Sequence, residues 1–151
     1  MPNLLQYPVA LFAAFRAGLI VVNTNPLYTA TEMRHQFKDS GAKAIVILAN
    51  FAHLLEGIIQ DTSIEHVIVT EIADQLPFLK RTLINFVIKN VKKMVPAYSL
   101  KHHTWSEALQ AGAGKTYVQP KLTHDDIAGT QSRGGNKQSM SITWKMSHQM
   151  C

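Results

Sequence analysis

The feature that most constrains the fold of this chain is an abrupt change of composition at Gly129. Residues 129–151 contain no aspartate or glutamate, and Ile142 is their only isoleucine, leucine or valine. Three of the chain's six methionines also fall there: Met140, Met146 and Met150. Such a stretch buries too little apolar surface to offset the entropy lost on ordering. We therefore expect a folded unit over residues 1–128 and a disordered or loosely held tail over residues 129–151.

The size and charge of the chain are those of one ordinary globular domain. It has 151 residues, of which 46% are hydrophobic and 17% are charged. Much of the net charge of +5 comes from the tail, which has three basic residues and no acidic residue. The residues before the tail include 12 basic and 10 acidic side chains, so their charges nearly balance. Dense basic residues occur only between Lys80 and Lys93. We therefore expect no nucleic-acid partner.

The single cysteine, Cys151, permits no intrachain disulfide and no cysteine-rich metal site. A reducing compartment fits this usage, and we expect a cytoplasmic protein. The apolar opening from Leu4 to Phe15 follows no positive charge and is interrupted by Arg16, so it resembles a buried helix more than a signal peptide. No charge-free run is long enough to cross a bilayer.

Helical and strand-like segments alternate through the first half of the chain. Thr29 to Glu32 has capping-box spacing and should start a helix that ends near Gly41. The expected order is a helix from Leu4 to Phe15 stopped by Gly18, a strand at Ile20–Asn23, the capped helix, a strand at Ala44–Leu48, a helix at about Phe51–Gln60 and a strand at His66–Thr70. This alternation predicts the α/β class, with a partial parallel sheet and flanking helices. Because a helix precedes the first strand, the chain is expected to start within a crossover.

A basic amphipathic helix is predicted from Leu79 to Val95. Its apolar positions gather on one side: Leu83, Ile84, Val87, Ile88, Val91, Met94 and Val95. The opposite side carries polar and basic residues: Arg81, Asn85, Lys89, Lys92 and Lys93. Such a helix either packs on its own sheet with a solvated basic face or lies in an anionic membrane interface. A shorter helix is expected after Trp105, ending near Gly112.

Candidate motifs for chemistry are few. The seven histidines are scattered without metal-ligand spacing, so no metal site is expected. Asp125 and Asp126 fit a polar turn leading into a strand better than a pair of catalytic acids. Gly114-Lys115-Thr116 ends like a phosphate-binding loop, but Leu109 stands where the first glycine of that pattern belongs and no strand precedes it. We assign no catalytic residue.

Several segments resemble bacterial long-chain fatty acid–CoA ligases of the adenylate-forming, AMP-binding superfamily. They include Met1-Pro2-Asn3-Leu4, Tyr7-Pro8, Arg16-Ala17-Gly18, Val21 to Thr29, Glu32, His35-Gln36, Asp39 to Ala42 and Asn50 to His53. The resemblance runs from Met1 to Ala128 and covers an interior part of the family's large N-terminal domain. It implies an enzyme that uses ATP and Mg²⁺ to convert a fatty acid to an acyl-adenylate and then passes the acyl group to coenzyme A.

The resemblance also implies a phosphate-holding loop directly after Ala128, rich in Thr, Ser and Gly. Gln131, Gly134 and Gly135 fall where family residues do, and the two glycines form at most a very weak remnant of that loop. Bulky or charged residues take its small and hydroxylic positions: Arg133, Asn136, Lys137 and Gln138. They should block the phosphates. We carry over no catalytic, cofactor-binding or metal residue and expect no cofactor for this chain alone.

The sequence therefore predicts a partial AMP-binding domain at 1–128 and a non-homologous tail at 129–151, out of frame or disordered, in a truncated and inactive ligase product. The alternative is a non-catalytic membrane-surface module that uses Leu79–Val95, with Arg81, Lys89, Lys92 and Lys93 contacting the inner face of the membrane. An active ligase completed by a second chain ranks last. Exposed apolar faces should favour self-association.

Overall fold

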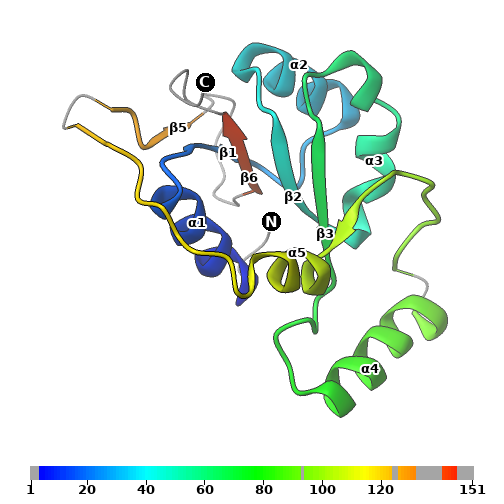
Figure 1. Ribbon diagram of the computed structural model, residues 1–151. Helices are drawn as coiled ribbons and strands as arrows, with labels where there is room; N and C mark the ends of the chain where they lie inside the picture. Colours follow the sequence, from blue (N-terminus) through cyan, green and yellow to red (C-terminus); the bar gives the residue numbers. More distant parts are fainter. Residues whose placement is uncertain (1–3, 93, 124–125, 132–140, 146–151) are drawn as a thin grey trace.

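The structure is a computed structural model that describes residues 4–92, 94–123, 126–131 and 141–145 (Figure 1). Its sheet has the strand order β4-β3-β2-β6-β1-β5. The strands are β1 (Ile20–Thr24), β2 (Ala44–Leu48), β3 (His66–Thr70), β4 (His103–Thr104), β5 (Gly129–Gln131) and β6 (Ser141–Lys145). The pairs β2–β3, β3–β4 and β1–β5 are parallel, which confirms the predicted α/β class.

Helices cover both faces of the sheet, because the apolar residues of its strands alternate between two cores. Ile45 and Ile47 of β2 contribute to one core, whereas Val46 between them contributes to the other. Successive strand residues point to opposite faces, so the two cores lie on opposite sides. A strand that is apolar on both faces is typical of a parallel sheet flanked by helices.

The first core is covered by α2 (Ala30–Ser40) and α3 (Ala52–Glu56). The capping box of α2 is present as predicted: Glu32 N donates to Thr29 Oγ1, and Thr29 N donates to Glu32 Oε2. Gly41 ends the helix in the left-handed conformation, with φ of 59°. Phe37 of α2 is fully buried in this core.

The second core lies under α1 (Gln6–Arg16) and α5 (Trp105–Gly112). Ala10 and Ala14 of α1 pack there with Trp105 of α5. The small side chains of the two alanines let α1 approach the sheet closely. Gly18 follows α1 with φ of +70°, which confirms the predicted helix stop. Thr104 and Glu107 form a second capping box at the start of α5.

The helix expected at Phe51–Gln60 is present but broken into three short pieces. They are η1 (Ala49–Phe51), α3 and η2 (Ile59–Asp61). Gly57 ends α3, and it is followed by two β-branched residues, Ile58 and Ile59. These residue types have low helix propensity, which accounts for the interruption.

Two segments of the expected tail lie in the sheet. β5 pairs with β1, and β6 lies antiparallel between β1 and β2. The sequence analysis anticipated a strand after Ile127 but not β6. Its sequence, Ser-Ile-Thr-Trp-Lys, contains three residues of high β propensity, which favours an extended conformation despite the low apolar content of the tail. Residues 132–140 and 146–151 lie outside the described residues.

The amphipathic segment forms α4 (Phe78–Phe86), which continues as the π-helical turn η3 (Val87–Val91). Figure 1 shows α4 projecting from the body of the domain beside β3 and α5. Leu79 and Leu83 are 80% and 65% exposed, and Phe86 is 59% exposed. The helix is confirmed from Leu79 to Val91, but it ends four residues before the predicted end at Val95. Much of its apolar surface has no cover from the sheet.

Candidate functional site

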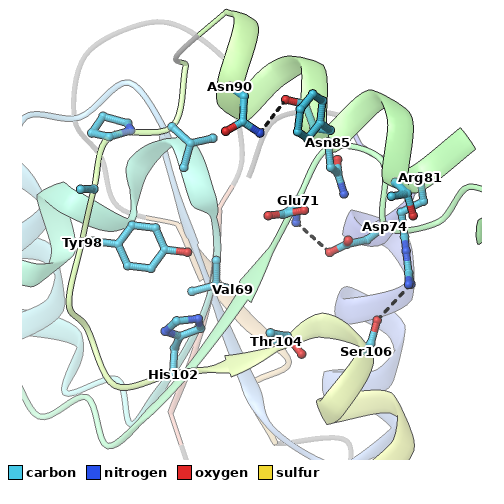
Figure 2. A pocket seen from close by; sticks show the side chains of 15 residues that line it. Val69, Glu71, Asp74, Arg81, Asn85, Asn90, Tyr98, His102, Thr104 and Ser106 are labelled. Atoms are coloured by element: carbon cyan, nitrogen blue, oxygen red, sulfur yellow. Dashed lines mark hydrogen bonds between the residues drawn. The ribbon is translucent and has the colours of Figure 1, made fainter.

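A broad open cavity with a volume of about 990 Å³ lies where β3 and β4 end, beneath α4 (Figure 2). Its walls combine α4, the turn after β3 and the segment that leads into β4. Polar and charged residues line much of it: Glu71, Asp74, Arg81, Thr82, Asn85, Asn90, Tyr98, His102, Thr104 and Ser106. The carboxyl ends of parallel strands are where α/β proteins commonly bind ligands.

Asp74 shapes the turn that leaves β3. Its Oδ2 atom accepts hydrogen bonds from the backbone amide of Glu71 at 2.7 Å and from Thr70 Oγ1 at 3.0 Å. Thr70 is completely buried, so its hydroxyl needs a partner inside the protein. These two hydrogen bonds occupy Asp74 Oδ2, which therefore stabilises the turn at the floor of the cavity.

Two side chains fasten α4 to the rest of the domain. The backbone amide of Ala73 donates to Asn85 Oδ1 at 3.1 Å, and Arg81 Nη1 donates to Ser106 Oγ on α5 at 3.3 Å. Figure 2 shows the Arg81–Ser106 bond bridging the two helices. These contacts fix one wall of the cavity, although α4 buries little of its apolar face.

Tyr98 and His102 form the opposite wall. Their rings meet edge to face with centroids 5.4 Å apart, and His102 Nδ1 lies 2.7 Å from the carbonyl oxygen of Leu100. Burial raises the pKa of the Tyr98 hydroxyl, and the negative charge of Glu71 raises it further. The phenol therefore remains protonated and can donate a hydrogen bond at the cavity wall.

The cavity residues were not predicted as a site. A signal was present, since Glu71 and Asp74 directly follow the predicted strand His66–Thr70 and so had to lie at its carboxyl end. Tyr98 lies in a connection without a periodic pattern, and Ser106 comes from α5, whose predicted helix gave no sign of a site. The cavity offers donors, acceptors and charges for binding a polar group, while several of its members already bind other parts of the protein.

Of the residues predicted for a phosphate loop or a membrane contact, only Arg81 is among the described residues that line this cavity. Gly134, Gly135, Arg133, Asn136, Lys137 and Gln138 lie outside the described residues, so the expectation of a damaged phosphate loop stays a prediction. Of the basic residues, Arg81 binds Ser106 and Lys92 is exposed. Lys93 and the side chain of Lys89 are outside the description.

The turn interpretation of Asp126 agrees with the structure. Asp126 Oδ2 accepts hydrogen bonds from the backbone amide of Thr123 at 2.6 Å and from its hydroxyl at 3.0 Å. Asp125 lies outside the described residues. Gly114 follows α5 with φ of 82°, in exposed chain without a preceding strand, so the resemblance of Gly114-Lys115-Thr116 to a phosphate loop is superficial.

No cluster of three or more histidine, cysteine, aspartate or glutamate side chains suited to a metal occurs within the described parts of the chain. In the same residues, no helix combines the length and apolar character needed to cross a membrane.

The sequence of the chain matches the model of a known protein family. The family model described as AMP-binding enzyme matches residues 1–131, a range that includes β1 to β5 and α1 to α5. The chain therefore belongs to the AMP-binding enzyme family, as its resemblance indicated. The match ends before β6.

The similar curated proteins share one name, long-chain-fatty-acid–CoA ligase. The chain is 54% identical over 136 residues to the long-chain-fatty-acid–CoA ligase of Haemophilus influenzae and 54% identical to that of Escherichia coli O157:H7. It is 27% identical to the enzyme of the same name from Bacillus subtilis. Each alignment covers 89% of this chain and 24% of the relative, so the chain spans about a quarter of these ligases. No solved structure matches.

Proposed function

We propose that this chain is a structural portion of a long-chain fatty acid–CoA ligase, and that it has no ligase activity alone. The ligase would activate a fatty acid with ATP and Mg²⁺ and transfer the acyl group to coenzyme A. The single observation that carries the proposal is 54% identity to a ligase over 89% of the chain. Within the enzyme, residues 1–131 would supply part of a sheet. The ends of its strands would help to form the substrate-binding site.

The proposed lack of activity follows from how little of the ligase is present and from its phosphate loop. The chain spans 24% of its relatives. Bulky or charged residues stand where the resemblance implies small ones: Arg133, Asn136, Lys137 and Gln138. Electrostatic catalysis of adenylate formation needs metal and donor groups arranged around the phosphates. We propose that those groups belong to the remaining length of the enzyme.

The test is fatty-acid-dependent release of pyrophosphate from ATP. Purified chain, boiled chain and the Haemophilus influenzae ligase would be assayed with ATP, Mg²⁺, palmitate and coenzyme A. We expect the relative to turn over and the chain to match its boiled control. Turnover clearly above that control would overturn the proposed inactivity.

A second candidate function is contact with a membrane surface, and we propose with it a cytoplasmic location at the inner face. The observation that favours it is the apolar surface of α4, where Leu79, Leu83 and Phe86 are mostly exposed. Lys80 and Lys92 are exposed on the same helical segment. The same apolar surface would also favour self-association.

Co-sedimentation with vesicles of phosphatidylglycerol and phosphatidylethanolamine tests the membrane proposal. Leu83→Asp should reduce pelleting strongly, as should conversion of Lys89, Lys92 and Lys93 to glutamate. Leu109→Asp, at a 51% exposed position on α5, is the matched control and should pellet like the unaltered chain. Equal pelleting of all four proteins would reject the membrane role, and pelleting without vesicles would indicate self-association.

A further inference from the structure

The segment that joins α5 to β5 crosses the outside of the domain with little regular structure. Among the residues that the structure describes, no helix or strand lies between Gly112 and Gly129. Figure 1 shows this segment running along α1 on its way to β5. We call residues 113–123 the strap. Val118 is 82% exposed and Leu122 is 53% exposed, so burial alone does not hold the strap in one place.

Tyr117 attaches the strap to the end of α1. Its hydroxyl donates a hydrogen bond to the carbonyl oxygen of Arg16 at 2.6 Å, and the guanidinium carbon of Arg16 lies 4.3 Å from the centre of the tyrosine ring. Arg16 is the last residue of α1, and the last carbonyl groups of a helix have no partner within it. A cation over the face of an aromatic ring is attracted to the ring. One side chain of the strap therefore makes two different contacts with a single residue of α1.

The strap also covers the junction between α1 and β1. A Cβ atom at Gly18 would lie 2.9 Å from Pro120 Cγ and 3.3 Å from Leu122 Cδ2. The strap therefore passes so close to Gly18 that a side chain at this position would meet it. Tyr117, Pro120 and Leu122 together fix the path of the strap over residues 16–18.

β5 follows the strap and pairs with β1, the strand that begins just after this junction. The Val21 amide of β1 donates to the carbonyl oxygen of Ala128 at 3.0 Å, and Gly129 then pairs with Val21. β5 has only three residues, and a ladder this short makes few hydrogen bonds that could define its register. The position of β5 along β1 therefore depends on where the strap delivers the chain.

We propose that Tyr117 and Arg16 are positioning residues, which attach the strap to α1 and so set the register of β5 on β1. The inference rests on the proposed function, because β5 leads directly into the segment that the resemblance assigns to the phosphates of ATP. A strap released at Tyr117 would let β5 slide along β1 and so change where the following sequence begins. The two residues act on nucleotide binding through β5, without contacting the nucleotide.

Amide hydrogen exchange of the full chain tests the Tyr117–Arg16 contact. The Val21 amide reports the start of the β1–β5 pairing, and the amides of β2 and β3 report the stability of the whole domain. Tyr117→Ala removes both interactions and should speed exchange at Val21 at least about fivefold, with β2 and β3 unchanged. Val118→Ala, at the next position, is the control and should change neither. Unchanged exchange at Val21, or equal acceleration in β2 and β3, would overturn the proposal.

Milder variants separate the two interactions and keep the test decisive if Tyr117→Ala does not fold. Tyr117→Phe keeps the ring but loses the hydroxyl, and should speed exchange at Val21 about twofold to tenfold. Arg16→Met removes the charge over the ring and should speed exchange about twofold to fivefold, whereas Arg16→Lys keeps the charge and should retain most of the protection. Equal exchange rates in Tyr117→Phe, Arg16→Met and the unaltered chain would contradict the proposal.

The consequence for nucleotide binding is measured in a ligase. In a chimera, residues 1–131 of this chain replace the matching stretch of the Haemophilus influenzae enzyme, so that the relative's own sequence follows β5. Tyr117→Ala should raise the KM for ATP at least about threefold and leave the KM for palmitate unchanged. An unchanged KM for ATP would contradict the proposal. An unaltered chimera that makes no palmitoyl-CoA would instead contradict the proposed function, and the exchange experiment would still decide the role of Tyr117.

Discussion

The backbone amide of Ala73 donates a hydrogen bond to Asn85 Oδ1 at 3.1 Å and so ties the turn after β3 to α4. Ala73 is completely buried, and its amide has no access to solvent water there. Much of the apolar surface of α4 is exposed, so apolar packing contributes little to its attachment. Hydrogen bonds such as Ala73–Asn85 therefore contribute more to holding α4 in place.

Asn85→Ala should therefore destabilise the domain by about 1–3 kcal/mol, the usual cost of leaving a buried amide unsatisfied. Urea unfolding followed by circular dichroism measures the change. The control is Asn90→Ala, since Asn90 Nδ2 donates to the carbonyl oxygen of Phe86 one turn earlier at an exposed position. Equal losses for the two variants would show that the Ala73–Asn85 bond has no special role.

The capping box of α2 should make stability depend on pH. Hydrogen bonds from the Thr29 backbone and hydroxyl lower the pKa of Glu32 below its ordinary value. A lowered folded pKa contributes stability that is present above the ordinary glutamate value of about 4.5 and is lost as pH falls through the lowered value.

Urea midpoints from pH 6 down to pH 3 would measure this contribution. The unaltered chain should lose more stability over this range than Glu32→Gln, whose side chain does not titrate. Parallel curves for the two proteins would contradict a role for the Glu32 carboxylate. Thr29→Ala should cost about 0.5–2 kcal/mol at neutral pH, because it removes the cap itself.

The first core should be the main source of stability. Phe37 is completely buried in it, and Phe37→Ala should cost about 3–5 kcal/mol through lost burial and the remaining cavity. Phe86→Ala removes the same side chain from a 59% exposed position and should cost far less. Thermal or urea unfolding compares them, and similar losses would mean that Phe86 is covered in solution.

Gly18 should not tolerate a side chain. Its φ is +70°, and a Cβ atom there would lie 2.9 Å from Pro120 Cγ. Gly18→Ala should cost at least about 1–2 kcal/mol, the penalty of the left-handed conformation. Gly112→Ala is the matched control, because no atom lies within 4 Å of its Cβ position. A Gly18→Ala variant as stable as Gly112→Ala would show that the α1–β1 junction adopts another conformation.

The sequence predicted the core of this fold because the signals there are local. The strands Ile20–Asn23, Ala44–Leu48 and His66–Thr70 were placed to within one residue, since each is a short apolar run bounded by turn residues. The Thr29–Glu32 capping box and Gly41 likewise determined both ends of α2.

Features that depend on distant contacts were less predictable. The cavity combines Asn85 of α4 and Ser106 of α5 with Glu71 and Tyr98 from two connecting segments, and these residues share no motif. β6 was missed because its place depends on the gap between β1 and β2, not on its own composition. The exposure of α4 could not be read from its periodicity, because an amphipathic pattern does not say what covers the apolar face.

The most direct test of the central claim, that residues 1–131 form a structural part of a long-chain ligase, is the activity of a chimera. The matching stretch of the Haemophilus influenzae ligase would be replaced by residues 1–131 of this chain, and palmitoyl-CoA formation would be measured in the purified protein. We predict that the chimera makes palmitoyl-CoA, because the two proteins are 54% identical over the 136 aligned residues. A chimera that folds and binds ATP like the parent enzyme but forms no palmitoyl-CoA would contradict the account.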